Sequence, residues 1–196
     1  MRKTPICIDL DGTLTPLDTL LVALFQLLWR KPWALFGLFF RLSDKVGFKA
    51  YLARVSRVHP ARIPYNKALI KEILAFKQAG HPLYLVTGTY ESIAKDIADH
   101  LGYFDGYYAT KDVNLTGSRK AAQLNKIFGE KTYLYAGNSV VDYKVWPSSK
   151  EGIVVGPKKI YKRAMSMCPV HVHIESGIKD GLAAYVTYFR RKPPQG

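Results

Sequence analysis

The chain has 196 residues, and 48% of them are hydrophobic, which suffices for a globular domain with a core and excludes a disordered chain. The formal net charge of +14 predicts an anionic partner: a phosphate, a nucleic acid or an acidic membrane surface. Two cysteines provide no disulfide framework, so the composition favours a reducing, cytoplasmic compartment.

The first predicted element is a short apolar strand, residues 6–8, which ends in the carboxylates of Asp9 and Asp11. It is too short for the apolar segment of a secretory signal. Residues i and i+2 of a strand face the same side, so the two carboxylates would repel each other unless a cation compensates. Gly12 and Thr13 then turn the chain. This pattern favours a metal-assisted attack on a phosphate; the alternative is an ordinary polar turn after a strand.

Residues 16–64 follow this strand and contain no strand signal. We expect them to form a small α-helical cap inserted after the first strand, with residues 1–15 and 65–196 forming the core. The helices predicted in the cap span residues 20–29, 33–42 and 48–58.

The first two cap helices are strongly apolar and are bordered by cations. Neither reaches the ~20 residues that a membrane span requires, and Arg30 and Lys31 would lie in mid-span, where charges are costly. They therefore form a hairpin that packs on itself, or one that also dips into the anionic inner surface of a membrane. The second alternative rests on a mixture of aromatic and cationic side chains, which suits a lipid headgroup layer. These side chains are Trp29, Trp33, Phe36, Phe39 and Phe40 beside Arg30, Lys31 and Arg41.

After residue 64 the chain alternates between strand and helix signals, which predicts an α/β fold with a parallel sheet covered by helices. Ligands of such sheets bind at the carboxyl ends of the strands. Asp9, Thr87 and Gly137–Asn138 all fall at predicted strand ends, so they should converge on one crevice. The predicted strands are 82–87, 107–109, 132–136, 152–155 and 170–174, and the predicted helices are 92–101, 121–128, 138–146, 157–167 and 178–189.

Four segments resemble, in order, the four motifs of the haloacid dehalogenase (HAD) superfamily. Residues 9–15, Asp-Leu-Asp-Gly-Thr-Leu-Thr, resemble the first motif. The other three are weak alone, but their order on the predicted elements makes a strong match over residues 5–146. The resemblance implies a HAD-like, Rossmann-like core and a phosphatase activity. The second, third and fourth motifs are residues 86–89, 117–120 and 136–142.

The resemblance assigns a role to each motif. Asp9 would be the nucleophile, and Asp11 the general acid and base. Thr87, the Gly88 amide and Lys120 would hold the phosphate. Mg²⁺ would be bound by Asp9, the main-chain carbonyl of Asp11 and the fourth motif, with Asn138 and Asp142 as its side chains.

Asn138 departs from the family pattern, since many relatives have Asp at this position. An amide oxygen still coordinates a metal, but with one negative charge fewer. The departure bears on metal affinity more than on mechanism, and it keeps a weakly active protein open as an alternative.

A closer resemblance is to the HAD-like domain fused to some membrane aromatic prenyltransferases. It implies a membrane-proximal or lipid-linked phosphate as the substrate, although a phosphorylated small molecule remains open. The residues that carry it are Asp18–Leu20, Ile63–Asn66, Tyr135–Ser139, Asp142 and Val145–Trp146.

We therefore expect a Mg²⁺-dependent hydrolase of phosphate monoesters that forms an aspartyl-phosphate. The alternatives are a phosphotransferase with the same intermediate, and a membrane- or partner-binding scaffold with weak or no activity. No nucleic-acid recognition motif is present, so specific nucleic-acid binding is not expected.

Overall fold

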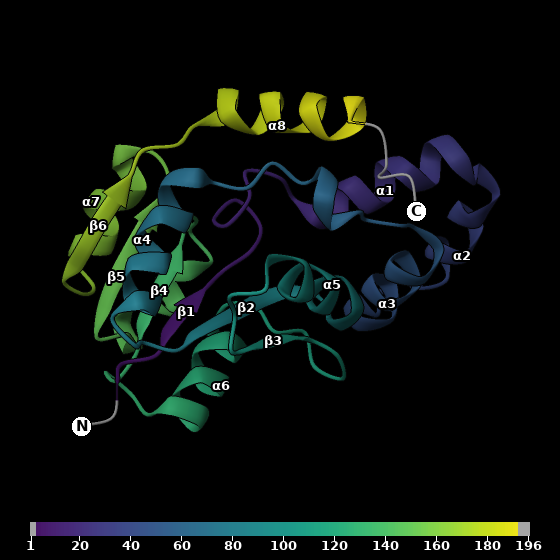
Figure 1. Cartoon of the computed structure of the whole chain (residues 1–196). Helices are drawn as coiled ribbons and strands as arrows, with labels where there is room; N and C mark the ends of the chain where they lie inside the picture. The colour runs from purple at the N-terminus through teal and green to yellow at the C-terminus, as the bar shows by residue number, and fades with distance from the viewer. Residues whose placement is uncertain (1–2, 192–196) are drawn as a thin grey trace.

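The computed structural model describes residues 3–191 and contains a six-stranded, wholly parallel sheet (Figure 1). The strand order is β3-β2-β1-β4-β5-β6, so the chain starts in the middle of the sheet and builds outward on both sides. This confirms the predicted α/β class. The strands are β1 (Ile6–Ile8), β2 (Leu83–Tyr90), β3 (Gly106–Thr110), β4 (Leu134–Gly137), β5 (Glu151–Val155) and β6 (Val170–Ile174).

Strand β1 places the first motif at the centre of the sheet. It pairs with β2 on one side and β4 on the other, and all three of its residues are buried. Ile6 and Ile8 pack into one hydrophobic core and Cys7 into the other, on the opposite face. A buried central strand tolerates only apolar side chains, so the first polar residue, Asp9, marks where the strand leaves the sheet. Its amide still donates to the carbonyl of Ala136 in β4 at 3.0 Å.

Helices α4 to α8 belong to the part of the chain that carries the sheet, and the cap holds the elements between β1 and α4. The cap lies at one end of the molecule, away from β5 and β6 (Figure 1). The core helices are α4 (Lys67–Gln78), α5 (Glu91–Leu101), α6 (Ser118–Phe128), α7 (Lys158–Met165) and α8 (Ile178–Arg190). The cap contains α1 (Thr19–Arg30), α2 (Leu35–Phe39) and α3 (Lys45–Val55), with the 3₁₀ turns η1 (Pro32–Ala34) and η2 (Pro60–Arg62).

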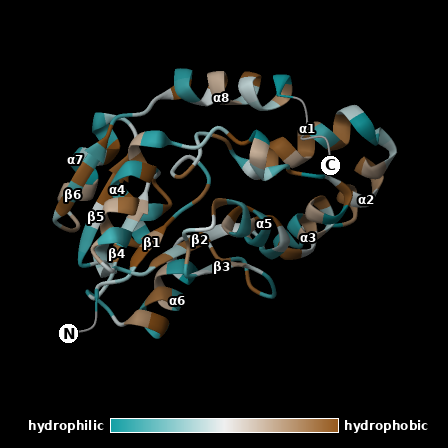
Figure 2. Cartoon of the chain, in the orientation of Figure 1, coloured by the Kyte–Doolittle hydropathy of each residue, from teal (hydrophilic) through white to brown (hydrophobic). Residues whose placement is uncertain are grey.

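Helix α1 begins at a side-chain cap and buries one face. The carboxylate of Asp18 accepts hydrogen bonds from the amides of Leu20 and Leu21, which satisfies donors that a helix start leaves free. Val22, Ala23 and Leu27 of the same helix are buried in the core. Apolar residues on its other face, such as Leu21 and Phe25, are exposed, as are Phe36 and Phe39 of α2. The ribbons of α1 and α2 carry many hydrophobic residues (Figure 2).

Helix α8 extends from the sheet side of the molecule to the cap (Figure 1). The Tyr188 hydroxyl accepts hydrogen bonds from the Gln26 side chain at 2.9 Å and from the His59 amide at 3.1 Å. The Arg62 guanidinium donates to the Tyr188 carbonyl at 2.8 Å. The C-terminal helix thus fixes the position of α1 and of the segment that returns from the cap.

Three local predictions differ from the structure. The helix expected over 138–146 is replaced by two 3₁₀ turns, η3 (Asp142–Lys144) and η4 (Trp146–Ser148), because Pro147 and the side-chain bonds of Asp142 interrupt helical pairing. In place of the helix expected over 33–42, the structure has the 3₁₀ turn η1 followed by the short helix α2. Helix α4 was not assigned from the sequence, although Asn66 caps it through the Leu69 amide.

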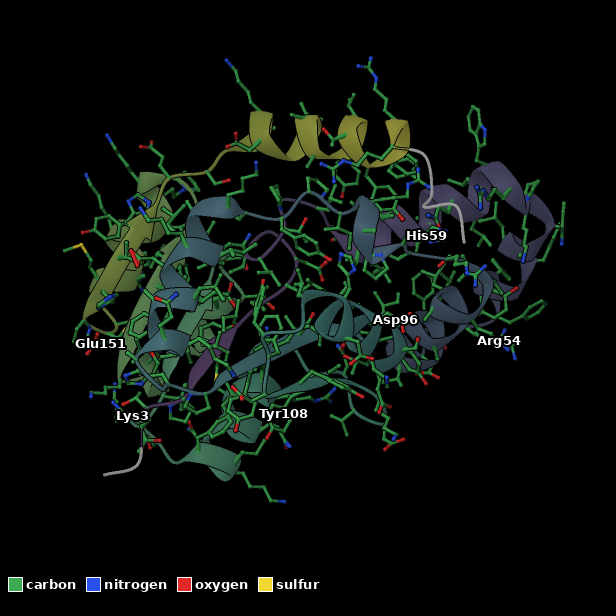
Figure 3. All side chains as sticks on the ribbon, in the orientation of Figure 1. Lys3, Arg54, His59, Asp96, Tyr108 and Glu151 are labelled. Carbon is green, nitrogen blue, oxygen red and sulfur yellow. The ribbon has the colours of Figure 1, made fainter. Side chains whose placement is uncertain are left out.

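No helix within residues 3–191 has the length and apolar character needed to cross a membrane. Cys7 and Cys168 are buried free thiols. Charged side chains project outward over the molecule, as Lys3 and Arg54 show at its two ends (Figure 3).

Candidate active site

A cavity of about 390 Å³ opens where the carboxyl ends of β1, β2 and β4 face the cap. The predicted site residues Asp9, Asp11, Gly88, Lys120, Asn138 and Asp142 all line it, and they come from segments far apart in the sequence. Thr87, also expected at this crevice, is fully buried and is not among the residues of the cavity wall, so the second motif reaches the cavity through Gly88 and Thr89.

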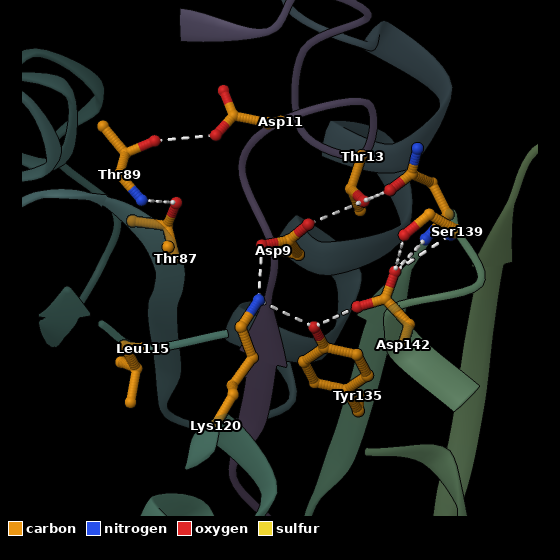
Figure 4. A network of polar contacts seen from close by, with 12 residues as sticks. Asp9, Asp11, Thr13, Thr87, Thr89, Leu115, Lys120, Tyr135, Ser139 and Asp142 are labelled. Carbon is orange, nitrogen blue, oxygen red and sulfur yellow. Dashed lines mark hydrogen bonds and ion pairs between the residues drawn. The ribbon is translucent and has the colours of Figure 1, made fainter. Parts of the chain in front are cut away.

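A continuous chain of hydrogen bonds joins the first, third and fourth motifs (Figure 4). The Lys120 ammonium donates to Asp9 Oδ1 at 2.6 Å and to the Tyr135 hydroxyl at 3.0 Å. The Tyr135 hydroxyl in turn donates to Asp142 Oδ1 at 2.6 Å. All four side chains are buried, so these contacts act in a medium of low effective dielectric, where charge pairs interact more strongly than in water.

Burial is the largest influence on the pKa values of Asp9 and Tyr135 in this set of hydrogen bonds. It raises the pKa of Asp9 to about 7, even though the neighbouring Lys120 ammonium lowers it, and the Asp142 carboxylate raises it further. Burial and the Asp142 carboxylate also raise the pKa of Tyr135 well above its usual range, so the phenol keeps its proton. A cation added near Asp9 would favour its ionised form.

Asp11 lies in a separate set of contacts at the same cavity. Its carboxylate accepts hydrogen bonds from the Thr19 amide and the Thr89 hydroxyl, both at 2.7 Å. Burial raises the pKa of Asp11, as does the nearby Asp18 carboxylate, and the two hydrogen bonds oppose this. A carboxyl group with a raised pKa holds its proton more readily, which suits a general acid.

Thr13 connects the first motif to Asn138. Its hydroxyl lies 3.2 Å from Asn138 Oδ1 and 3.5 Å from Asp9 Oδ2, so the two candidate metal oxygens face the same group. Gly12 has a φ of +75°, and a Cβ at that position would collide with the Asn138 amide. Glycine is therefore required both by the turn and by the close approach of the fourth motif.

The carboxylate of Asp142 organises the loop that carries Asn138. Its Oδ2 accepts hydrogen bonds from the amides of Asn138 and Ser139, at 3.0 and 2.9 Å, and from the Ser139 hydroxyl at 3.0 Å. With the bond from Tyr135, both oxygens of Asp142 are already engaged.

The donor set fits Mg²⁺, which prefers oxygen ligands and keeps several waters. Asp9 would supply a carboxylate, Asp11 a main-chain carbonyl and Asn138 an amide oxygen. Within the described part of the chain, no three His, Cys, Asp or Glu side chains gather as a metal site. A metal would therefore be held by these mixed oxygens.

The second motif borders the cavity at the end of β2. Thr87 is fully buried, and its hydroxyl accepts a hydrogen bond from the Thr89 amide at 3.0 Å; Gly88 and Thr89 line the cavity. The strand also runs past Thr87 to Tyr90, further than predicted.

Three functional candidates lie outside the residues selected from the sequence: Lys49, Thr89 and Tyr135. Lys49 of the cap donates to the Gly88 carbonyl at 2.6 Å and to Asn114 Oδ1 at 2.7 Å, and it lines the cavity. Burial lowers the pKa of its ammonium, while Asp11 and Asp18 raise it. Thr89 stands inside the second motif and Tyr135 directly precedes the fourth, so each carried a weak sequence signal. Lys49 carried none, because its position depends on the cap fold.

Residues 6–145 match the family model for haloacid dehalogenase-like hydrolases. The chain belongs to the haloacid dehalogenase-like hydrolase family. A relative from Sinorhizobium fredii (strain NBRC 101917 / NGR234), the uncharacterized protein y4nM, is 36% identical over 157 residues. That alignment covers 79% of this chain and 30% of the relative, so the chain spans less than a third of that protein's length.

Solved structures of the same fold include a phosphoserine phosphatase in its apo form, with a TM-score of 0.60 and 16% identity, covering 93% of this chain and 98% of that one. A second is a phospho-aspartyl intermediate analogue of phosphoserine phosphatase, with a TM-score of 0.56 and 18% identity, covering 93% of this chain and 99% of that one. At these identities the likeness establishes the HAD fold with its helical cap.

Proposed function

We propose that this HAD-family chain is a Mg²⁺-dependent phosphatase that hydrolyses a phosphate monoester through an aspartyl-phosphate on Asp9. The observation that carries the proposal is the buried pair of Asp9 and Lys120, 2.6 Å apart, at the end of the central strand and on the wall of the cavity. A nucleophilic carboxylate that must approach an anion needs a fixed cation beside it.

In the proposed reaction, an oxygen of Asp9 attacks phosphorus, and the bond to the leaving alcohol breaks. Asp11 gives its proton to that alcohol. Asp11 then takes a proton from water as the water attacks the aspartyl-phosphate, which releases phosphate and restores Asp9. This cycle splits a very slow hydrolysis into two easier steps.

The remaining residues position the phosphoryl group. Lys120 and the Gly88 amide would stabilise its non-bridging oxygens, and the buried Thr87 would support this end of β2 by accepting a hydrogen bond from the Thr89 amide. Mg²⁺, when bound by Asp9, the Asp11 carbonyl and Asn138, would neutralise charge on the phosphate. Asp142, expected as a ligand, would support the site mainly by holding the Asn138 loop.

The likeness to the phosphoserine phosphatase solved as a phospho-aspartyl intermediate analogue supports this chemistry by analogy of fold. The same intermediate would serve a phosphotransferase, which differs only in the acceptor hydroxyl.

Turnover of an aryl phosphate tests the proposal. The wild-type protein should release phosphate with Mg²⁺ and lose this activity in excess EDTA, and Asp9→Asn should be inactive although its circular dichroism is unchanged. Equal rates for Asp9→Asn and the wild type would reject Asp9 as the nucleophile.

A second proposed function, association with an anionic membrane surface, rests on the exposed face of the cap. Trp29, Phe36 and Phe40 are 92%, 77% and 79% exposed, whereas soluble monomers rarely expose large apolar patches. Residues 19–43 contain three cations and no acidic residue. This combination would place the protein at the inner membrane surface, near lipid-linked phosphates.

Vesicle flotation tests the second function. The protein should float with phosphatidylcholine vesicles that contain phosphatidylglycerol and should float less with phosphatidylcholine alone. Arg30→Gln with Lys31→Gln should reduce flotation more than Lys158→Gln with Lys159→Gln, which removes the same charge from α7. Absence of flotation with anionic vesicles would reject membrane association.

A further inference from the structure

Part of the cavity wall is apolar and comes mainly from the cap. Leu20 and Ala23 come from α1, Leu52 from α3 and Ile93 from α5, and Leu17 precedes α1. Four of the five are buried, and Leu20 is partly exposed. The part of a phosphate monoester that lies beyond its phosphate would meet these side chains.

The acidic side chains of the same cavity are already engaged. Asp9 pairs with Lys120, and both oxygens of Asp11 accept hydrogen bonds. Asp142 holds the Asn138 loop, and Asp18 caps α1. Within residues 3–191, every carboxylate on the cavity wall therefore has a structural partner.

The cavity also contains a cation from the cap. Lys49 donates to two neutral oxygens, those of Gly88 and Asn114, and pairs with no carboxylate in the described part of the chain. A substrate with an ammonium group would lose its hydration against apolar walls, and it would compete with Lys49 for the Asp11 and Asp18 carboxylates, which already favour the Lys49 ammonium. An uncharged apolar alcohol would instead gain from burial.

We propose that the substrate is the phosphate monoester of an apolar, uncharged alcohol, and that Leu20 and its neighbours bind the alcohol part. This inference rests on the proposed phosphatase function. Burial of each additional methylene should tighten binding about fourfold, until the chain fills the cavity.

A series of alkyl phosphates tests the proposal against phosphoethanolamine, which carries an ammonium group. For the wild type with Mg²⁺, kcat/KM should rise from ethyl through butyl to hexyl phosphate, and hexyl phosphate should exceed phosphoethanolamine by at least about tenfold. A flat series, or a preference for phosphoethanolamine, would overturn the proposal.

A matched pair of variants tests the wall itself. Leu20→Glu places a carboxylate on the wall, in the first turn of α1 where an acid favours the helix, and Leu20→Gln has the same size without the charge. The ratio of hexyl phosphate to phosphoethanolamine should fall strongly in Leu20→Glu and only moderately in Leu20→Gln. Equal ratios in the two variants would contradict a role for this wall, and thermal melting of both variants checks that they fold.

A binding measurement separates this proposal from the activity. Titration calorimetry of Asp9→Asn with hexyl phosphate and with phosphoethanolamine requires no turnover. Tighter binding of hexyl phosphate would support the apolar site even if the wild type hydrolysed neither compound. Equal binding would reject the apolar site even if an aryl phosphate were hydrolysed.

Discussion

The Lys120 ammonium donates to Asp9 Oδ1 at 2.6 Å, and both side chains are buried at the carboxyl end of the central strand. One oxygen of Asp9 is therefore held by a cation, while the other, Oδ2, lies 3.5 Å from the Thr13 hydroxyl, which is also 3.2 Å from Asn138 Oδ1. The Oδ1 side of the Asp9 carboxylate therefore contacts the third motif, and the Oδ2 side is connected to the fourth motif through Thr13.

Replacing Lys120 with Met should lower kcat/KM for an aryl phosphate by about 10²- to 10³-fold, because the cation that offsets charge at Asp9 and on the phosphoryl group is lost. Steady-state kinetics measures the loss. Lys126→Met, on the exposed side of the same helix, is the control and should retain activity. A Lys120→Met enzyme with more than half of the wild-type kcat/KM would contradict the assigned role.

Replacing Asn138 with Asp should tighten the apparent Mg²⁺ affinity by about tenfold, because it adds a negative charge to the oxygens around the metal. The Mg²⁺ dependence of turnover gives this affinity. Asn125→Asp, at the Tyr133 hydroxyl and away from the cavity, is the control. An unchanged or weaker Mg²⁺ dependence in Asn138→Asp would show that Asn138 does not contact the metal.

Replacing Asp11 with Asn should separate the two chemical steps. An activated aryl alcohol leaves without a proton, so the first step should persist with p-nitrophenyl phosphate, whereas water attack loses its base. Rapid mixing should then show a burst of p-nitrophenol near one per protein, followed by a slow phase about 10²- to 10⁴-fold below the wild type.

An alkyl phosphate is the comparison substrate for Asp11→Asn, because its leaving alcohol does require a proton. This substrate should show no burst. Equal losses for the two substrates and no burst with either would indicate that Asp11 is not the proton carrier.

Replacing Lys49 with Met should raise the KM for phosphate monoesters by about tenfold and change kcat less, because Lys49 is a cap cation that lines the cavity and forms no ion pair with a carboxylate among residues 3–191. Lys45→Met, exposed at the start of the same helix, is the control. A loss confined to kcat, or a fall in melting temperature without a change in KM, would assign Lys49 a different role.

The sequence was informative where local chemistry is unusual. Two carboxylates directly after an apolar strand, followed by Gly12, destabilise the fold unless they serve a site, so the first motif could be predicted. The alternation of strands and helices in the core could be predicted from its strand and helix signals. Lys49 could not, because its place depends on how α3 packs over β2 rather than on its neighbours in sequence. The loop after Asn138 was misassigned because the side chain of Asp142 replaces the backbone bonds of a helix.

The phosphoryl group should be carried by Asp9 during turnover. An acid quench during turnover, followed by peptide mass spectrometry, detects a phosphorylated residue directly. We expect the added mass of one phosphoryl group on Asp9 in the wild type, more of it in Asp11→Asn, and none in Asp9→Asn. Phosphate release by a protein that never shows this modification, or its appearance on a residue other than Asp9, would rule out Asp9 as the nucleophile.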